Sequence, residues 1–542
     1  MHTKQRSTRF KWRSLVAMAA TATLLLTGCS VGAATTAVAK HDLVIARAMD
    51  LTTLDPDRGY CDTCQIVFTA LYDRLVIVSP EDSKTLQPGL ASTFTANADN
   101  TQFTFGLDPA ATFSDASPVE PKDVKWSLER LANIKGSASY LLAGMTSIDT
   151  PDAKTVVVNF AAPNSAFLAI VAASYLGIVN SDVASEHGAS AAADASTADT
   201  AEDWFLSNSA GSGPYILDSY TANSAVKLTA NPNYWRTKPT FDTVTLKEVT
   251  DSSSQLQQLQ QGDVDIAMQI SPDALDQLKN SPTVTTAAVD SFNYTYIALM
   301  PGAEGGAPLA DVRVREAIRD AIDYDNIVKT LVAGYGKLQG SPIPNGFEGS
   351  EKVALPSYDV TKAKALLAEA GYPDGFTISS TYPKIVAYGV DLDLQMQAIQ
   401  QNLASVGITL ELTPVDFSQW ADVIGGKGTP ITAVYFAPDH TDSSQYVQYF
   451  GLIPNGGYVA NFASLAGKTV NQAEVDGLTT ALAQTGAERT ASYQSLAQLM
   501  ADDVNILPIV NPQLIMAHAS DITGVTYSPC CNVDLGALGL TK

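Results

Sequence analysis

The sequence lacks the features that define several classes of protein. Its 33 basic residues are outnumbered by 56 acidic ones, which gives a net charge of −23 at pH 7. So acidic a chain offers no basic surface to the phosphate backbone of a nucleic acid, and no nucleic-acid partner is expected. After the N-terminal segment, no apolar run reaches the roughly 18 residues that a membrane-spanning helix needs. This excludes a protein that crosses a membrane many times.

Motifs of catalysis and of cofactor binding are also missing. The chain has no Walker-type phosphate loop and no H-E-x-x-H zinc motif. The histidines after the N-terminal segment, at positions 41, 187, 440 and 518, are too scattered for ligand spacing. A catalytic triad can assemble from distant residues, so a secreted hydrolase stays an alternative. The sequence nevertheless predicts no enzyme, no cofactor and no resident metal.

The chain contains enough apolar material for large cores. Hydrophobic residues make up 46% of it and charged residues only 16%, which excludes a mainly disordered protein. Its 542 residues are too many for one core, and domains of roughly 100–200 residues predict two to four domains or lobes.

The first 30 residues resemble an export signal of the lipoprotein type. Residues 1–14 carry five basic side chains and no acid, and the apolar run Leu15–Leu26 follows. This pattern is typical of a secretory signal, and the run is too short for a membrane anchor. Leu-Thr-Gly-Cys at residues 26–29 resembles a bacterial lipobox, which implies cleavage before Cys29 and lipid on that residue. Residues 1–28 would be the signal peptide, and residues 29–40 a tether to the outer face of the cytoplasmic membrane, in the cell envelope or periplasm.

Four cysteines remain after Cys29, namely Cys61, Cys64, Cys530 and Cys531. An even number in an exported chain predicts one or two disulfides, because thiols oxidise outside the cell. The four thiolates could instead hold a metal, although no histidine stands beside them. The sequence leaves the pairing open, and a bridge between the two clusters requires them to be neighbours in space.

Hydrophobic periodicity predicts helices and strands in alternation. The helices are expected at Pro121–Leu131, Asp311–Ile322, Asp359–Ala370, Leu394–Val406 and Ser492–Val504, and the strands at Thr155–Phe160, Val226–Thr229, Val244–Val249, Thr377–Thr381 and Ile408–Thr413. A helix, a glycine and a strand in succession, as around Gly407, are typical of α/β units. Residues 189–202, rich in Ala, Ser, Thr and Asp, predict a surface loop.

Four segments carry motifs that occur in the same order in one family. They are Phe113-Ser-Asp-Ala-Ser-Pro-Val119 with Asp123-Val-Lys-Trp-Ser127, Gly211-Ser-Gly-Pro-Tyr-Ile216 with Asn231-Pro-Asn-Tyr-Trp235, Asp311-Val-Arg-Val-Arg-Glu-Ala-Ile318 with Ala321-Ile-Asp323, and Lys362-Ala-Lys-Ala-Leu-Leu367 with Ala370-Gly-Tyr-Pro373. Together they resemble the family 5 solute-binding proteins, the peptide and nickel binders of ABC importers. Ala116 departs from the pattern, because the family prefers glycine after the acid. Most of these positions predict turns, caps and core plugs, and Asp311 with Arg313 is expected to cap and brace a helix.

The resemblance implies an α/β, two-lobed periplasmic-binding-protein fold of type II, from the large peptide-binding cluster. Lobe I would comprise residues 41–290 and 506–542, with an extra subdomain at about residues 80–205, and lobe II residues 291–505. The chain would cross between the lobes near residues 288–296 and 503–512, and closure would be a hinge motion. Both cysteine clusters then fall in lobe I.

The resemblance also implies a ligand site. A zwitterionic peptide needs a carboxylate for its ammonium and a cation for its carboxylate. In dipeptide-binding relatives the ammonium partner is an aspartate in a segment resembling G-W-x-x-D-x-x-D-P. The corresponding stretch, residues 434–443, puts Asp439 at the ammonium position and Asp442 at the second acid, with Phe436 instead of tryptophan and Ser443 instead of proline. Lys384 is the expected cation, and the expected wall residues are Tyr60, Cys61, Phe292, Tyr294, Trp420, Tyr435 and Phe436.

The expected function is capture of a peptide and its delivery to an ABC permease with its ATPase, by a membrane-anchored monomer. The same fold with another solute, such as a nickel chelate, an oligosaccharide, an opine or haem, is the alternative. A nickel chelate would require a histidine near the cleft, where only His440 is expected. An oligosaccharide would require several tryptophans, and Trp126 and Trp235 already belong to fold motifs. A peptide-sensing receptor and a secreted hydrolase are alternatives of a different class.

Overall fold

The computed structural model describes residues 42–79, 84–452, 462, 471–529 and 531–541. The described residues all belong to one compact unit, which begins at residue 41. The predicted signal peptide, Cys29, the predicted tether and Cys530 lie outside the described residues. No helix within these described ranges combines the length and the apolar character needed to span a membrane.

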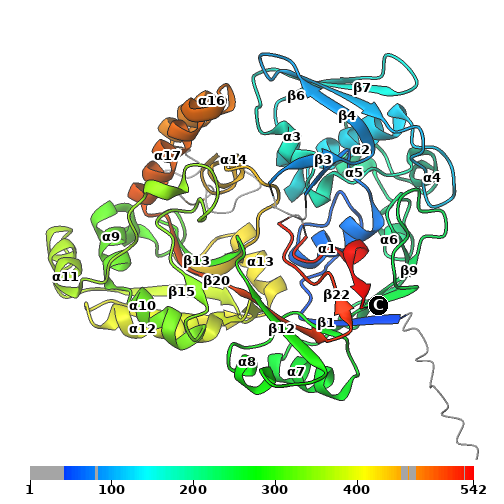
Figure 1. Cartoon of the computed structure of the whole chain (residues 1–542). Helices are drawn as coiled ribbons and strands as arrows, with labels where there is room; N and C mark the ends of the chain where they lie inside the picture. The colour runs from blue at the N-terminus through cyan, green and yellow to red at the C-terminus, as the bar shows by residue number, and fades with distance from the viewer. Residues whose placement is uncertain (1–41, 80–83, 453–461, 463–470, 530, 542) are drawn as a thin grey trace, which may run out of the picture. The chain divides into compact units, whose positions relative to one another are not determined.

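The first large sheet has seven strands (Figure 1). β1 (Asp42–Arg47) lies at its centre, parallel to β10 (Thr243–Glu248) on one side and to β11 (Ile266–Ala267) on the other. The outer strands are β9 (Ala225–Ala230) and β8 (Tyr215–Thr221) beyond β10, and β21 (Leu514–Ala519) and β12 (Val284–Val289) beyond β11. The parallel pairing brings the carboxyl end of β1, at Arg47, beside those of its two neighbours.

Helix α1 (Asp62–Leu71) packs on this sheet, and all ten of its residues are buried. Its last turn lies against the Gly211-Ser-Gly-Pro motif. A Cβ atom at Gly211 would come within 2.0 Å of Leu71 O, and one at Gly213 within 2.4 Å of Ala70 O. Larger residues at these two positions would therefore displace the helix, so the motif sets the position of α1.

The predicted extra subdomain contains a four-stranded antiparallel sheet, in the order β4–β5–β7–β6. These strands are β4 (Ala91–Ala96), β5 (Gln102–Leu107), β7 (Thr155–Phe160) and β6 (Met145–Asp149). Helix α2 (Pro121–Ile134) buries Val124, Leu128 and Leu131, the apolar face expected from the sequence. At its start, the Glu120 N–H donates to Asp123 Oδ2 at 2.9 Å.

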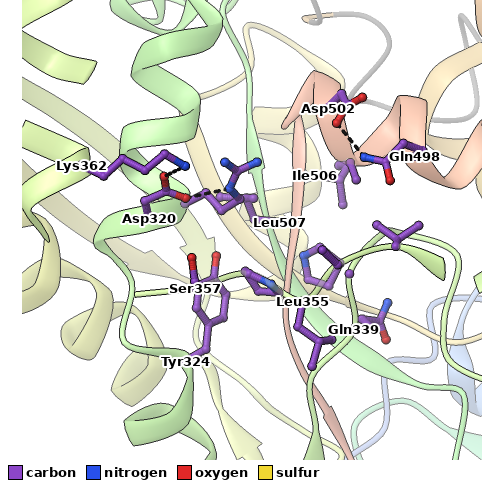
Figure 2. A pocket seen from close by; sticks show the side chains of 17 residues that line it. Asp320, Tyr324, Gln339, Leu355, Ser357, Lys362, Gln498, Asp502, Ile506 and Leu507 are labelled. Carbon is purple, nitrogen blue, oxygen red and sulfur yellow. Dashed lines mark hydrogen bonds and ion pairs between the residues drawn. The ribbon is translucent and has the colours of Figure 1, made fainter. Parts of the chain in front are cut away.

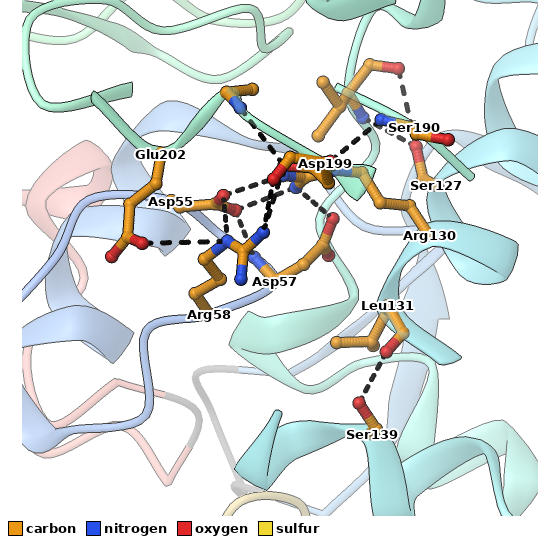
Figure 3. A network of polar contacts seen from close by, with 12 residues as sticks. Asp55, Asp57, Arg58, Ser127, Arg130, Leu131, Ser139, Ser190, Asp199 and Glu202 are labelled. Carbon is orange, nitrogen blue, oxygen red and sulfur yellow. Dashed lines mark hydrogen bonds and ion pairs between the residues drawn. The ribbon is translucent and has the colours of Figure 1, made fainter. Parts of the chain in front are cut away.

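A buried cluster of charges joins α2 to the connection between β1 and α1 (Figure 3). Arg130 is fully buried and pairs with Asp55, Asp57 and Asp199 at 2.6–2.9 Å. Burial would lower the pKa of Arg130, but the carboxylates raise it. Burial, reinforced by the charges of Asp55 and Asp199, raises the pKa of Asp57 to about 7 against the effect of Arg130. Asp199 belongs to residues 189–202, so the predicted surface loop is anchored by a buried side chain and includes the short helix α5 (Ala195–Ala198).

The second large sheet has six strands, in the order β14–β20–β13–β19–β15–β18. They are β14 (Gly336–Lys337), β20 (Ile506–Pro512), β13 (Tyr294–Leu299), β19 (Ile431–Phe436), β15 (Thr377–Pro383) and β18 (Thr409–Val415). β15 and β18 are parallel and are joined by α12 (Leu392–Ala404), which confirms the predicted α/β unit. Gly407 ends the connection with φ of +91°, a conformation that favours glycine.

The remaining predicted helices also form. They are α9 (Val312–Ala321), α11 (Val360–Glu369) and α17 (Gly486–Asp503), the last of which begins six residues before its predicted start at Ser492. The cap predicted at Asp311 is confirmed, because its carboxylate accepts the Arg313 N–H at 2.9 Å.

The chain passes between the two large sheets twice. It goes from β12 to β13 and returns from β20 to β21. The crossings are hydrogen-bonded to each other, since Asn511 Nδ2 donates to Ser291 O at 2.9 Å and Ser291 Oγ donates to Pro512 O at 3.1 Å. β20 pairs with β13, so the return crossing follows Pro512.

Candidate functional site

A cavity of about 110 Å³, the first chamber, lies where the start of α1 faces β19 and α13 (Phe417–Gly425). Its lining residues are Tyr60, Cys61, Asp62, Gln65 and Tyr175 on the side of the seven-stranded sheet, and Tyr296, Phe417, Trp420, Val434, Tyr435, Phe436, Ala437, Asp439 and Tyr449 on the side of the six-stranded sheet. Because both sides supply walls, movement of one against the other would open the chamber.

Two carboxylates line the first chamber, Asp62 and Asp439, and Asp439 is the one on the side of the six-stranded sheet. It follows the end of β19 by three residues and is only 2% exposed. Tyr60 Oη donates to Asp439 Oδ2 at 2.7 Å, and Tyr140 Oη donates to the same oxygen. Burial raises the pKa of Asp439 to about 6, although the two tyrosine hydrogen bonds lower it. Within the described chain no lysine or arginine pairs with this carboxylate, so it lacks a compensating cation.

Aromatic rings form much of the remaining wall. Tyr60 stacks with Tyr175 and Tyr449, at ring-centroid distances of 5.2 and 6.3 Å. Phe436 packs against Tyr449 at 4.9 Å. Trp420 is fixed by its indole N–H, which donates to Thr432 Oγ1 at 2.9 Å. Apolar walls with a few fixed polar groups are typical of small-molecule sites.

A second chamber, of about 70 Å³, borders the first and shares Asp62, Phe417 and Tyr435 with it. Arg47, at the end of β1, lines this chamber and pairs with Asp62 at 2.9 Å. Tyr435 Oη donates to Asp50 Oδ2 at 2.6 Å and so joins the two large sheets.

The charges of the second chamber influence one another. Burial would raise the pKa of Asp50, but Arg47 and the hydrogen bonds from Thr63 and Tyr435 hold it below the usual value. The pKa of Asp62 is raised, because burial and the charge of Asp50 outweigh Arg47. Burial would lower the pKa of Arg47, but the two carboxylates raise it, so the guanidinium stays charged.

The structure brings together most of the residues proposed for the site from the sequence. Asp439, Phe436, Tyr435, Trp420 and Tyr60 all line the first chamber, as does Cys61. Tyr435 also lines the second chamber.

The other proposed residues lie apart from the two chambers. Lys384 is exposed and lines neither of them. Tyr294 is buried in an aromatic core and donates its hydroxyl to Pro342 O at 2.9 Å. Phe292 packs against Phe347 and Tyr527, at ring-centroid distances of 4.8 and 6.0 Å. Asp442 also lines neither chamber; its carboxylate pairs with Arg489, which lowers the pKa of Asp442 against the effect of burial.

Cys61 and Cys64 form a disulfide at the start of α1. Cys531 is buried, and its predicted companion Cys530 lies outside the described residues. The disulfide removes two of the four thiolates from the metal site considered above. No group of three or more His, Cys, Asp or Glu side chains in the described ranges could hold a metal ion. His440 is buried, and burial lowers its pKa to about 4.

Sequence reasoning missed several residues that line the chambers or contact Asp439. Tyr140 belongs to the short helix η1 (Ser137–Leu142) of the predicted extra subdomain, and no motif marks it. Tyr175 and Tyr449 likewise follow no recognisable pattern. Arg47 had one usable signal, its position at the carboxyl end of a buried strand, where α/β folds place ligand-binding groups.

A larger cavity, of about 180 Å³, lies beside α9 and α17 (Figure 2). Lys362 and Arg319 pair with Asp320 there at 2.8 and 2.9 Å, so this carboxylate is already compensated. The cavity shares no lining residue with the two chambers and contains none of the proposed site residues. We assign it no part in the site.

Known proteins resemble the chain in both sequence and fold. Residues 85–457, more than half of the chain, match the model of the bacterial extracellular solute-binding proteins, family 5. The chain is 30% identical over 502 residues to the "Probable D,D-dipeptide-binding periplasmic protein DdpA" of Escherichia coli (strain K12), over 91% of this chain and 93% of that protein.

Two solved structures show the likeness in fold. DppA from Helicobacter pylori, in complex with the peptide STSA, superposes with a TM-score of 0.81 at 21% identity, over 92% of this chain and 98% of that chain. AgaA from A. tumefaciens R10, in complex with agropinic acid, superposes with a TM-score of 0.79 at 24% identity, over 92% and 99%.

The mixed α/β architecture is therefore that of the two-lobed, type II periplasmic binding proteins, as the sequence predicted. Such proteins bind solutes outside the cytoplasm and catalyse no reaction. The family model matches more than half of the chain, and the relative with 30% identity aligns over most of both chains. The chain belongs to the family 5 extracellular solute-binding proteins of ABC importers.

Proposed function

We propose that this protein captures short peptides between two lobes and delivers them to an ABC permease powered by its ATPase. The observation that carries the peptide assignment is Asp439, a buried carboxylate that lies in an aromatic-lined chamber and pairs with no cation among the described residues. A peptide ammonium is the group that would complete it, because it supplies both the positive charge and several hydrogen-bond donors.

The energetics of the site support an ammonium ligand. A buried carboxylate without a cation is costly, and the raised pKa of Asp439 reflects that cost. Tyr60 and Tyr140 supply only neutral donors to Oδ2, which offset part of it. An entering ammonium would restore the charge balance and would thereby favour the closed arrangement.

The proposed lobe boundaries follow the sequence prediction with one adjustment. Lobe I would comprise residues 41–290 and the C-terminal tail, with the extra subdomain at residues 80–205. Lobe II would start at residue 291 and extend to Pro512, because β20 pairs with β13. Contacts between the proposed lobes, such as Tyr435 to Asp50 at 2.6 Å and the Ser165 N–H to Leu482 O at 3.0 Å, support a hinge-closed arrangement.

Ligand names among the relatives support a short peptide without deciding its identity. The relative DdpA is named for D,D-dipeptides, and the structural neighbour DppA holds the peptide STSA. The opine alternative has a structural neighbour in AgaA with agropinic acid, which at 24% identity supports the fold alone. The chamber volumes of about 110 and 70 Å³ favour a ligand of few residues.

Export and anchoring also belong to the proposal. Residues 1–28 would be removed, Cys29 would carry the lipid, and residues 29–40 would tether a monomer to the membrane surface. Cells grown with a radiolabelled fatty acid should label the wild-type chain but not a Cys29→Ser variant, which should leave the membrane fraction. Equal labelling of both would refute the lipid assignment.

Calorimetric titration of the full chain, purified in detergent, tests the ligand class. The probes are Ala-Ala, in its L,L and D,D forms, and Leu-Leu, each with and without an N-terminal acetyl group. We expect at least one free dipeptide to bind, and its acetylated form to bind at least about 100-fold more weakly, because acetylation removes the charge that Asp439 would pair with.

Two variants sharpen this test. Asp439→Asn should lose the discrimination between free and acetylated peptides, whereas Asp218→Asn, a neutralisation of an exposed acid that pairs with Lys227, should keep it. Equal affinity of wild-type protein for both peptide forms would refute the ammonium role of Asp439. If no peptide binds and native mass spectrometry detects a single non-peptide solute or a metal, the alternative ligands of this fold replace the proposal.

A further inference from the structure

One nitrogen of a guanidinium in the second chamber, Nη1 of Arg47, has no hydrogen-bond partner among the described residues. Arg47 is 2% exposed. Its Nη2 donates to Asp62 Oδ2 at 2.9 Å and its Nε donates to Ala48 O at 3.2 Å. Its Nη1 is buried and meets no hydrogen-bond acceptor within the part of the chain that the structure describes. A buried donor without an acceptor is unfavourable, so this position favours the arrival of one.

The acids beside Arg47 are, by contrast, well supplied with donors. Asp50 accepts hydrogen bonds from the backbone N–H groups of Asp62 and Thr63, from Thr63 Oγ1 and from Tyr435 Oη, at 2.6–2.8 Å. Asp62 accepts from Arg47, from Asn532 Nδ2 and, at 3.4 Å, from Tyr388 Oη. In hydrogen-bonding terms, the demand that the described residues leave open in this cluster is therefore for an acceptor at Nη1, although the two carboxylates face a single guanidinium.

The first chamber has the opposite demand. Tyr60 and Tyr140 both donate to Oδ2 of Asp439, and no cation pairs with that carboxylate within the described ranges. The two chambers share Asp62, Phe417 and Tyr435 as walls. One site therefore offers a carboxylate in one chamber and an open guanidinium donor in the adjoining one. A short zwitterion, positive at one end and negative at the other, matches both.

We propose that Arg47 binds the free carboxylate of the ligand, with Nη1 donating to a carboxylate oxygen in the second chamber. This inference rests on the proposed peptide function and adds a second requirement, a free C-terminus. It also assigns the cation that the sequence could only place at Lys384, whose side chain is exposed and lines neither chamber. The two chambers adjoin, so the ammonium and the carboxylate of the ligand must lie close together. Each residue of an extended chain adds about 3.3–3.6 Å between the charged ends, so this arrangement favours short ligands.

The first test changes the ligand and leaves the protein intact. Each dipeptide of the titration above that binds is compared with its C-terminal amide, which keeps the carbonyl acceptor and loses the negative charge. We expect amidation to weaken binding by about 10- to 100-fold, the range for a hydrogen bond to a charged partner. Amides that bind as tightly as free acids would overturn the role of Arg47, and would leave the ammonium role of Asp439 intact.

The second test changes the protein. Arg47→Lys keeps the charge beside Asp62, and Arg47→Gln removes it; both should bind free dipeptides at least about 10-fold more weakly, and Arg47→Gln should bind acids and amides equally. Arg313→Gln is the matched control, because this arginine has a side chain that is 43% exposed, pairs with Asp311 and lines neither chamber. Thermal unfolding of each variant identifies loss of fold.

The outcomes separate the two proposals. If Arg47→Gln unfolds, the test is the ratio of the affinity for the free dipeptide to that for its amide, compared between Arg47→Lys and the wild type. A wild-type ratio near one, or an unchanged ratio in a folded Arg47→Gln variant, would mean that water serves Nη1 and would overturn the inference. Failure of the wild type to bind any peptide would instead refute the proposed function, and this inference with it.

Discussion

Replacement of Asp439 by asparagine is expected to stabilise the ligand-free protein while it removes affinity for an ammonium. The carboxyl is buried, and burial raises its pKa from 3.8 to about 6. At about 1.4 kcal/mol for each pKa unit, this shift corresponds to up to about 3 kcal/mol of stability lost at neutral pH. The folded state binds the proton more tightly than the unfolded state, so the loss begins near pH 4 and is complete above about pH 6. Asparagine is neutral, nearly isosteric and still able to accept the Tyr60 hydroxyl, so it escapes this loss.

Urea unfolding of the ligand-free wild type and of Asp439→Asn, followed by circular dichroism at pH 7.5 and at pH 4, measures the effect. The variant should be more stable by about 1–3 kcal/mol at pH 7.5, and the difference should shrink toward zero at pH 4, where the wild-type carboxyl is protonated. Asp218→Asn, at an exposed ion pair, should change stability by less than about 0.5 kcal/mol. A variant that is no more stable than wild type at pH 7.5, or a gain that does not depend on pH, would refute the reasoning.

Three further predictions concern the pKa of Asp439 and the buried charge cluster around Arg130. Because burial raises the pKa of Asp439 to about 6, the affinity for a free dipeptide should fall about 10-fold between pH 7.5 and pH 5 in calorimetric titrations, and a flat profile would contradict this. Tyr140→Phe removes a hydrogen bond that lowers this pKa, so the midpoint of the same profile should move to higher pH, and a shift to lower pH would argue against the contact. Arg130→Met removes the cation paired with Asp57 and leaves Asp55 and Asp199 paired with Arg58 alone, so it should cost about 3–5 kcal/mol in urea unfolding and leave the dipeptide affinity of the folded fraction unchanged; a loss below about 1 kcal/mol would show that the cluster is not a stabilising one.

Local patterns predicted much of the secondary structure, because helix and strand formation depend on neighbours in sequence. The strand at Thr155–Phe160 and the helix after Pro121 appear where the apolar spacing indicated them. The predictions failed where distant contacts decide. Residues 189–202 have the composition of a free loop, yet Asp199 is drawn inward by Arg130, a partner 69 residues earlier in the chain. Composition alone contains no signal of such a pair.

Some residues of the candidate site could likewise be predicted from the sequence, and others could not. Asp439 could be proposed because it lies in a segment that resembles the peptide binders, and Tyr435 and Phe436 were proposed from the same segment. Lys384 was proposed from its place before a helix, but its side chain is exposed and lies outside both chambers. Tyr140 reaches Asp439 across 299 residues, and the extra subdomain that supplies it carries no motif for that contact.

Family membership and ligand identity therefore reside in different residues of this chain. The motifs that identify the family perform structural tasks: Gly211 admits the backbone of α1 and Asp311 caps a helix. Arg47, which lines the second chamber, and Tyr140, which donates a hydrogen bond to Asp439, lie outside those motifs. Evolution can keep the structural motifs and change the residues of the ligand site without altering the fold, because the chamber walls form only a part of the hydrophobic cores. A likeness that covers most of the chain thus establishes the fold and the solute-binding role, and the ligand has to be identified from the charged groups that face the two chambers.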